Sequence, residues 1–300
     1  MSMDGDLIDR WHQALARPMD VGEPPVGRAD GEVEAVVDRR NGRVRLGHLY
    51  QRQPLRVLTP TPATGEPLTL VVSNVSGGMV GGDRYRTAVV AEEGADLLVC
   101  GQAAEKVYRS KGADTEVTVD LSLEAGARME WLPQGTILFD GARLQRRTTV
   151  DLAAGAQFLA GEILVFGRLG MGEVMRRGRL HDRWRLRTQG RLVWADALVL
   201  DDDIGGTLDH PAAFNGARAL ATVVYAARDA ADLLSPVREV LAGHADTGVR
   251  TAATVWPGLL LMRILGADSA ALRRAFGHCW SWLRAAALGR PATLPVLWQI

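Results

Sequence analysis

Short runs of alternating apolar and polar residues fill the first two thirds of the chain, a pattern typical of β-strands. Two such runs, at residues 33–37 and 44–46, flank Asn41 and Gly42, a dipeptide that favours a tight hairpin turn. Similar runs continue, each bounded by glycine or polar residues. The pattern therefore predicts a mainly β structure over about residues 31–205.

A sequence repeat runs through the middle of this region. Each of its three copies places a Gly-Ala pair between two strand-like runs, and the glycines are Gly94, Gly126 and Gly155. A period of about 30 residues with one turn per copy is typical of stacked β-coils, in which each copy covers the apolar face of the next. We therefore expect a stacked, β-helix-like architecture.

Helical signals appear only towards the C-terminus. Residues 213–234 fit either a helix or a strand, whereas Ser235 followed by Pro236 is a typical helix start. Asp268 or Ser269 can cap a longer helix, whose apolar residues recur at helical spacing. The sequence thus predicts a few α-helices after the β region, followed by an extended tail.

The domain organisation follows from these patterns. Residues 1–30 carry only a weak amphipathic stretch and a loop rich in proline and glycine, so we expect a mobile N-terminal segment. Residues 31–300 show no linker. They are predicted to form one domain, with a β-rich core at 31–205 and a mixed or helical part at 206–300.

Bulk composition excludes several classes of protein. The 35 basic and 35 acidic side chains balance, so no overall charge favours nucleic acid or a membrane surface. No signal peptide and no uninterrupted apolar run of membrane-spanning length is apparent. The two cysteines, Cys100 and Cys279, cannot form a disulfide framework, so a reducing cytoplasm is expected.

The glycine-rich stretch at residues 77–83 resembles a phosphate-binding loop but lacks its chemistry. Gly77 and Gly82 have the required spacing, yet Asp83 stands where the loop needs a lysine. A β-branched run follows instead of the helix whose N-terminus would bind phosphate. A nucleotide-binding protein is therefore a disfavoured hypothesis, and a sharp glycine turn between two strands is expected.

Several carboxylates lie among apolar residues directly after the repeat turns. If the copies stack, these side chains can line one internal path, and carboxylates suit transient binding of a divalent ion. The alternative is that each forms a buried ion pair with an arginine, for example Glu162 with Arg168. The candidate metal-path residues are Asp83, Glu130, Asp140 and Glu162.

Other catalytic or metal signatures are absent from the sequence. The histidines show no metal-ligand spacing apart from the adjacent His278 and Cys279, which point in different directions on a helix. No G-x-S-x-G motif or comparable local signature of a catalytic triad is present. Cys100 lies in an apolar strand and is expected to be a core residue.

Four segments resemble the UreD (also called UreH) family of urease accessory proteins. Residues 73–83 resemble that family's S/N-P-x-G-G-I-V-G-G-D motif, and residues 102–109 its Q-A-A-T-K-V-Y-R. Residues 130–142 resemble E-W-L-P-Q-E-T-I-x-F-D-G-A, and residues 159–163 resemble L-G-W-E-I. The matching residues that we expect to be structural are Gly77, Gly78, Gly81, Gly82, Gln102, Lys106, Tyr108, Arg109, Pro133 and Gln134.

The chain departs from these motifs at a few positions. The proline of the first motif is absent, Glu105 replaces a threonine, Gly135 a glutamate and Gly161 a tryptophan. Because Gly135 stands where the motif has a glutamate, any acidic path through the molecule would have one carboxylate fewer.

The resemblance implies a scaffold rather than a catalyst. It implies a non-enzymatic protein that acts with UreF-like and UreG-like partners to deliver nickel to apo-urease, with no tightly bound cofactor and nickel only in transit. It also implies an internal tunnel for nickel. The stacked repeat alone leaves an alternative open, a β-solenoid enzyme that acts on carbohydrate through paired carboxylates.

Overall fold

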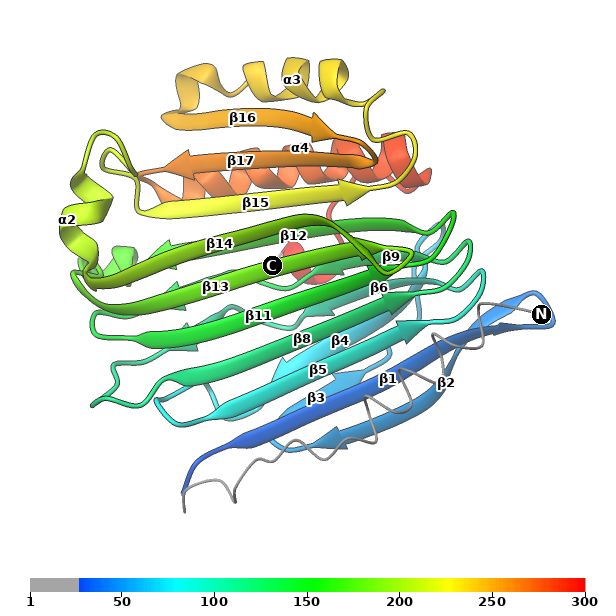
Figure 1. The fold of residues 1–300 in the computed structure, drawn as a ribbon, viewed down its shortest axis with the longest axis horizontal. Helices are drawn as coiled ribbons and strands as arrows, with labels where there is room; N and C mark the ends of the chain where they lie inside the picture. Colours follow the sequence, from blue (N-terminus) through cyan, green and yellow to red (C-terminus); the bar gives the residue numbers. More distant parts are fainter. Residues whose placement is uncertain (1–26, 300) are drawn as a thin grey trace.

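Two β-sheets face one another and helices cover the outer side of the second sheet in the computed structural model, which describes residues 27–299 (Figure 1). The first sheet has the strand order β14 (Arg191–Asp203), β13 (Arg177–Thr188), β11 (Arg143–Leu152), β8 (Thr115–Leu123), β5 (Arg84–Ala91), β1 (Asp30–Arg40) and β2 (Arg43–Arg52). The second has the order β16 (Val249–Trp256), β17 (Leu259–Gly266), β15 (Ala219–Ala226), β12 (Gln157–Phe166), β9 (Arg128–Leu132), β6 (Asp96–Gly101), β4 (Leu68–Asn74) and β3 (Leu55–Leu58), with the short β7 (Glu105–Val107) and β10 (Thr136–Leu138) beside it.

The helical elements within residues 27–299 are few. The α-helices are α2 (Ile204–Asp209), α3 (Leu234–Ala242) and α4 (Ser269–Leu288), of which α4 is the longest, and the 3₁₀ turns are η1 (Leu169–Met171), η2 (Ala245–Thr247) and η3 (Val296–Trp298). The predicted fold class, a mainly β stacked coil with a few helices towards the C-terminus, is confirmed. No helix within residues 27–299 combines the length and the apolar character that crossing a membrane requires. The predicted N-terminal segment lies almost wholly outside the described residues.

The predicted repeat is the coil of the fold. Each copy runs along the first sheet, turns at its glycine and returns along the second sheet, as from β5 to β6, from β8 to β9 and from β11 to β12. Gly94, Gly126 and Gly155 all have positive φ angles, of 65°, 65° and 74°, which glycine adopts without steric cost. Because each copy stacks on the previous one, neighbouring strands of the coil are parallel.

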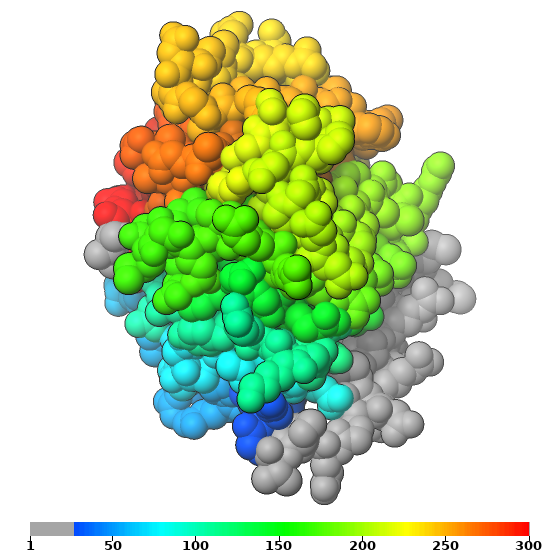
Figure 2. All heavy atoms as spheres, turned by 90° about the vertical axis from the view of Figure 1, so that its left-hand side faces the viewer, coloured from blue at the N-terminus to red at the C-terminus, as the bar shows by residue number. Residues whose placement is uncertain are grey.

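The return connections of the coil form four stacked corners at the opposite end of the strands. They comprise residues 75–83, 102–114, 133–142 and 167–176, each leading from the second sheet back to the first. Figure 2 shows this end of the molecule, where colours follow one another from cyan through green in the order of the chain. The corners therefore form a continuous surface in which successive coils touch.

Two cores hold these layers together. The first lies between the sheets and includes Leu97, Met129 and Phe158, all fully buried. The second lies between the second sheet and helices α3 and α4, where the rings of Phe276 and Trp280 stack at 5.9 Å between centroids. Burial of this apolar area is what fixes the helices on the sheet.

Most local predictions agree with the structure. Asn41 and Gly42 form the β1–β2 hairpin turn, with φ angles of 52° and 76°. The ambiguous stretch at 213–234 contains strand β15, which pairs antiparallel with β12 and extends the second sheet. Helix α4 starts at the predicted cap, where the carboxylate of Asp268 accepts the backbone N–H of Ala270 at 2.8 Å.

The extended tail predicted for residues 291–300 is only partly correct. Residues Val296–Trp298 form a 3₁₀ turn because Trp298 turns inward and is buried. Its indole Nε1 donates to the carbonyl of Leu132 at 3.2 Å, and Arg273 lies 4.3 Å from its ring centroid. The gain from burying this large side chain outweighs the preference for an extended chain.

Candidate functional site

The family-like motifs lie at the stacked corners and bind one coil to the next. The Tyr108 hydroxyl donates to the carbonyl of Gly77 at 3.1 Å, and a guanidinium nitrogen of Arg109 lies 3.2 Å from the carboxylate of Asp140. Each of these contacts joins residues 31 positions apart, which is about one coil. The motif residues therefore act as links between coils.

The glycines of the first corner allow these close contacts. A Cβ atom at Gly78 would stand 2.4 Å from the Tyr108 ring, and one at Gly81 would stand 2.0 Å from the Ser110 hydroxyl. Any larger residue would push the second corner away. The loop leads into strand β5, so it is the glycine turn between strands that the sequence predicted.

Asp83 closes this glycine turn. Its side chain is only 3% exposed, and its two oxygens accept the backbone N–H groups of Ala29 at 3.0 Å and Val80 at 2.8 Å. The Tyr85 hydroxyl donates to the same carboxylate at 3.2 Å. Burial raises the pKa of Tyr85 to about 12, so this hydroxyl keeps its proton. An aspartate here is explained by the hydrogen bonds that it accepts.

Asp140 lies at the third corner and is half-buried. Its Oδ1 accepts the backbone N–H groups of Arg176 at 2.8 Å and Arg177 at 3.0 Å, in addition to the contact with Arg109. Partial burial alone would raise its pKa, but these N–H groups and the neighbouring guanidiniums hold the pKa below its usual range. Asp140 is thus ionised and joins three successive coils.

Glu162 lies between the two sheets in a buried group of three charges. Its carboxylate lies 2.6 Å from a nitrogen of Arg146, which is also 2.6 Å from Asp182. All three side chains are at most 8% exposed. One guanidinium thus faces two carboxylates, which leaves one excess negative charge when both are ionised. Burial, and then the charge of Asp182, raise the pKa of Glu162 against the opposing effect of Arg146.

A cavity of about 100 Å³ adjoins this group between the sheets. Glu162 and Arg146 line it on one side, and Glu105 lines it with Thr136 at the corner end. Apolar side chains such as Met79 and Trp131 form the rest of the wall. The cavity brings carboxylates of two different coils to one internal space.

Sequence reasoning did not include Glu105 among the candidate path residues and noted it as a departure from the family motif. Burial raises its pKa to about 7, although Asn74 donates to it at 3.2 Å. The signal was available in the sequence, since an acidic residue replaces a neutral one inside a motif that leads into the interior. Arg146 and Asp182 were also missed, because they reach Glu162 from other strands.

Glu130 belongs to a different network, on the helix side of the second sheet, where it binds Arg284 of α4. Its carboxylate accepts both Nε and Nη2 of Arg284, at 2.9 and 3.0 Å, and both side chains are at most 1% exposed. Arg284 also forms a two-point contact with Glu66, at 2.9 and 2.6 Å. Burial raises the pKa of Glu130, and Arg284 opposes that effect.

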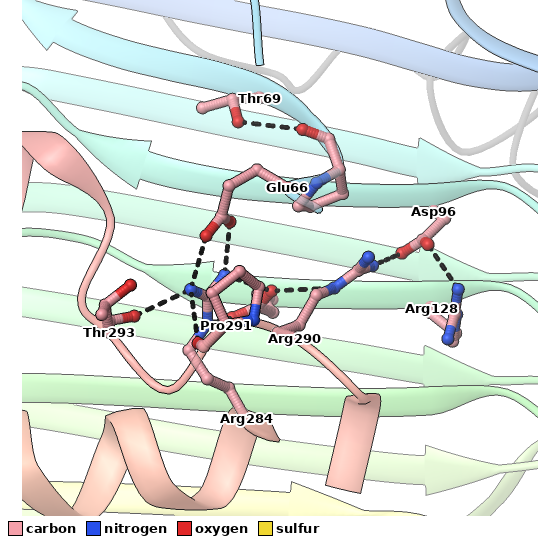
Figure 3. A network of polar contacts seen from close by, with 10 residues as sticks. Glu66, Thr69, Asp96, Arg128, Arg284, Arg290, Pro291 and Thr293 are labelled. Carbon is pink, nitrogen blue, oxygen red and sulfur yellow. Dashed lines mark hydrogen bonds and ion pairs between the residues drawn. The ribbon is translucent and has the colours of Figure 1, made fainter. Parts of the chain in front are cut away.

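The Glu130 network extends along the sheet through Arg290. This residue lies 3.6 Å from Glu130 and also binds Asp96, which contacts Arg128 in turn (Figure 3). Arg284 further donates to the carbonyl of Thr293 at 2.8 Å. The network therefore fastens the end of α4 and the tail to the coil.

The four predicted metal-path carboxylates are not brought together. Glu130 and Glu162 point to opposite faces of the second sheet, while Asp83 and Asp140 lie at separate corners. Within residues 27–299 no group of three or more potential ligands stands close enough to hold a metal ion. The example pair Glu162–Arg168 was wrong: Arg168 binds Glu173, and Glu162 binds Arg146. The separation also argues against a paired-carboxylate glycosidase centre formed by Glu130 and Glu162.

The remaining motif residues have structural contacts. Gln134 donates to the carbonyl of Leu297 at 2.8 Å and accepts from Arg273 at 3.2 Å, so it holds the tail. Gln102 accepts a hydrogen bond from Ser73 across neighbouring coils. Pro133 lines the internal cavity, and the backbone carbonyl of Lys106 accepts the N–H of Met79 at 2.7 Å.

Comparison with known proteins agrees with this geometry. The family profile described as UreD urease accessory protein matches residues 29–299. The chain belongs to the UreD family. Among its relatives, the urease accessory protein UreD of Magnetococcus marinus is 50% identical over 264 residues, covering 87% of this chain and 91% of the relative. The UreD of Methylobacterium sp. (strain 4-46) is 45% identical, over 86% and 90% of the two chains.

One departure from the UreD motifs has a clear physical reason. Gly161 stands where the motif has tryptophan, and a Cβ here would lie 2.7 Å from both the Phe276 and Trp280 rings. Helix α4 thus supplies the aromatic groups at this place, and a side chain on the strand has no room. By contrast, a Cβ at Gly135 would meet only ordinary contacts with Ile163, at 3.7 Å.

Proposed function

We propose that this chain is a non-catalytic scaffold, or chaperone, for urease maturation in the cytoplasm. In this proposal it acts with UreF-like and UreG-like proteins to insert nickel into apo-urease. Membership of the UreD family, whose members are named as urease accessory proteins, supports the urease role. Asp83, Glu130 and Asp140 are held in ion pairs and hydrogen bonds within the fold, which suits a scaffold.

The cavity between the sheets is the observation that carries the nickel proposal. Glu162 and Glu105 line it, and the Glu162–Arg146–Asp182 group carries one excess negative charge when both carboxylates are ionised. A divalent cation that approaches Glu162 would lower the cost of that buried charge. Nickel is a borderline ion that accepts oxygen ligands, and a weak site is suitable for cargo that must leave again.

We assign different tasks to the four predicted carboxylates. Glu162 is the one that contacts nickel in transit, together with Glu105, which the sequence prediction did not include. Glu130, Asp83 and Asp140 keep the walls of the path in place through the contacts already described. No tightly bound cofactor is part of this proposal, and nickel is the cargo.

The test is the substitution Glu162→Gln in cells that contain urease and the other accessory proteins. Glutamine keeps the shape of the side chain, and Arg146 remains paired with Asp182, so the fold should persist. We expect the nickel content and activity of purified urease to fall several-fold while the complex still co-purifies. The matched control is Glu93→Gln, which removes a charge from an exposed turn.

Two results would count against parts of this proposal. Unchanged nickel loading with Glu162→Gln would remove the residue and the cavity from the path. Failure of the chain to co-purify with UreF-like and UreG-like partners or with apo-urease would remove the scaffold role itself.

A further inference from the structure

Two histidines that lie far apart in the sequence meet on the helical layer. His244 precedes η2 and His278 lies in the middle of α4, 34 residues later. The Nε2 atom of His244 is 2.9 Å from the Nδ1 atom of His278, and the rings are inclined by 70°. Sequence spacing could not reveal this pair, because its members come from separate elements.

The distance between the two nitrogens is that of neighbouring ligands on one metal ion. With metal–nitrogen bonds of about 2.0–2.1 Å, two ligands at a right angle are about 2.9 Å apart, whereas tetrahedral ligands are about 3.3 Å apart. The pair therefore fits the right-angle geometry of square-planar or octahedral ions with little movement of the backbone. Each ring has only to turn so that its lone pair points outward.

The surroundings hold the pair in place but leave it open. Helix α4 is fixed on its other face by Trp280 and Arg284, and the Thr247 hydroxyl donates to the carbonyl of His244 at 2.7 Å. His278 is exposed, so an ion can approach from solvent.

We propose that His244 and His278 form a surface site for one divalent transition-metal ion such as Ni²⁺ or Cu²⁺. The ring that donates the present hydrogen bond moves its proton to its other nitrogen, so binding releases no proton. No third protein ligand is available within residues 27–299, so water completes the coordination and the ion exchanges readily. This site lies outside the internal cavity, and its failure would not affect the proposed path.

Copper binding to the full-length, tag-free chain tests the site. Electron paramagnetic resonance after one equivalent of Cu²⁺ should show two imidazole nitrogens, and calorimetry with Ni²⁺ should show one site of matching stoichiometry. Either His244→Gln or His278→Gln should weaken this binding on the order of 100-fold, because the second imidazole acts at high effective concentration.

The control is His48→Gln, which removes an exposed histidine of strand β2 and should leave binding unchanged. Each variant is checked by thermal melting, since the pair lies on the surface and its loss should not unfold the chain. The proposal is overturned if the two-nitrogen signal survives both single substitutions, or if His48→Gln weakens binding equally, because either result means adventitious binding only.

Discussion

Asp83 illustrates how the surroundings of a single residue decide between two explanations of the same sequence feature. The sequence singled it out as a carboxylate in a glycine loop, and the structure gives its two oxygens three hydrogen-bond donors. Its carboxylate supplies hydrogen-bond acceptors that the backbone of this sharp turn does not provide. The position is therefore fixed by the fold before any function is considered.

Replacing Asp83 by alanine should destabilise the protein. The substitution leaves the N–H groups of Ala29 and Val80 and the Tyr85 hydroxyl without an acceptor, at a cost of about 2–4 kcal/mol in the free energy of unfolding. Urea denaturation measures this change, with Asp232→Ala on the exposed surface as the control. Equal stability of the two variants would show that the turn does not need its carboxylate.

The raised pKa of Glu105 predicts that the stability of the folded protein depends on pH. Its pKa of about 7 in the folded protein lies above the ordinary value of 4.5, so the native state binds the proton more tightly than the unfolded state does. The stabilisation that this tighter proton binding gives the folded protein is fully present below pH 4.5 and is lost as the pH rises through 7. The full change amounts to about 3 kcal/mol, because one pKa unit corresponds to about 1.4 kcal/mol.

The variant Glu105→Gln should remove that contribution. Its free energy of unfolding should fall less than that of the wild type between about pH 5 and pH 8, and at the upper limit the variant should be the more stable protein. Denaturation series at several pH values measure the difference. Parallel curves for the two proteins would mean that Glu105 is not buried as described.

At the scale of single residues, the ion-pair partners of buried charges were the least predictable feature. Glu130 and Glu162 were recognised as carboxylates in apolar surroundings, which is where the structure places them. Their arginines, Arg284 and Arg146, are 154 and 16 residues away in the sequence. Spacing along one strand cannot identify a partner that arrives from a helix or from the opposite sheet.

At the scale of elements, turns and the cap of α4 were predictable because their chemistry is local. The glycines of the repeat, the Asn41-Gly42 hairpin and the Asp268 cap all act through their own backbone neighbours. The hairpin of β16 and β17 was missed, because its apolar sequence fits a buried strand and a buried helix equally well. The inward turn of the tail was missed because it depends on the packing of Trp298.

Helix α4 depends on one buried arginine. Substitution of Arg284 by methionine would leave Glu66 without its cation and Glu130 with only Arg290 at 3.6 Å, and should cost about 3–5 kcal/mol in the free energy of unfolding. Exposed Arg274, on the same helix, supplies the control variant Arg274→Met. Adding Glu130→Gln to Arg284→Met should recover part of the loss, and no recovery would contradict the role of the network.

At the scale of the whole molecule, the repeat period indicated stacked coils but not how many faces each coil has. Within residues 27–299 the structure shows two large sheets with an internal cavity, and a helical layer on one side only (Figure 1). This arrangement separates two carboxylates that the sequence had placed on one path: Glu162 faces the cavity and Glu130 faces the helices. The sidedness of a strand relative to a distant helix cannot be obtained from the strand's own pattern.

The most direct test of the central claim is the nickel content of urease purified from cells that lack this chain. We predict that urease accumulates as a folded but nickel-poor enzyme with little activity, and that the wild-type chain restores both. Restoration should also occur with Glu93→Gln but only weakly with Glu162→Gln. Urease that is fully loaded with nickel in the absence of the chain would contradict the account.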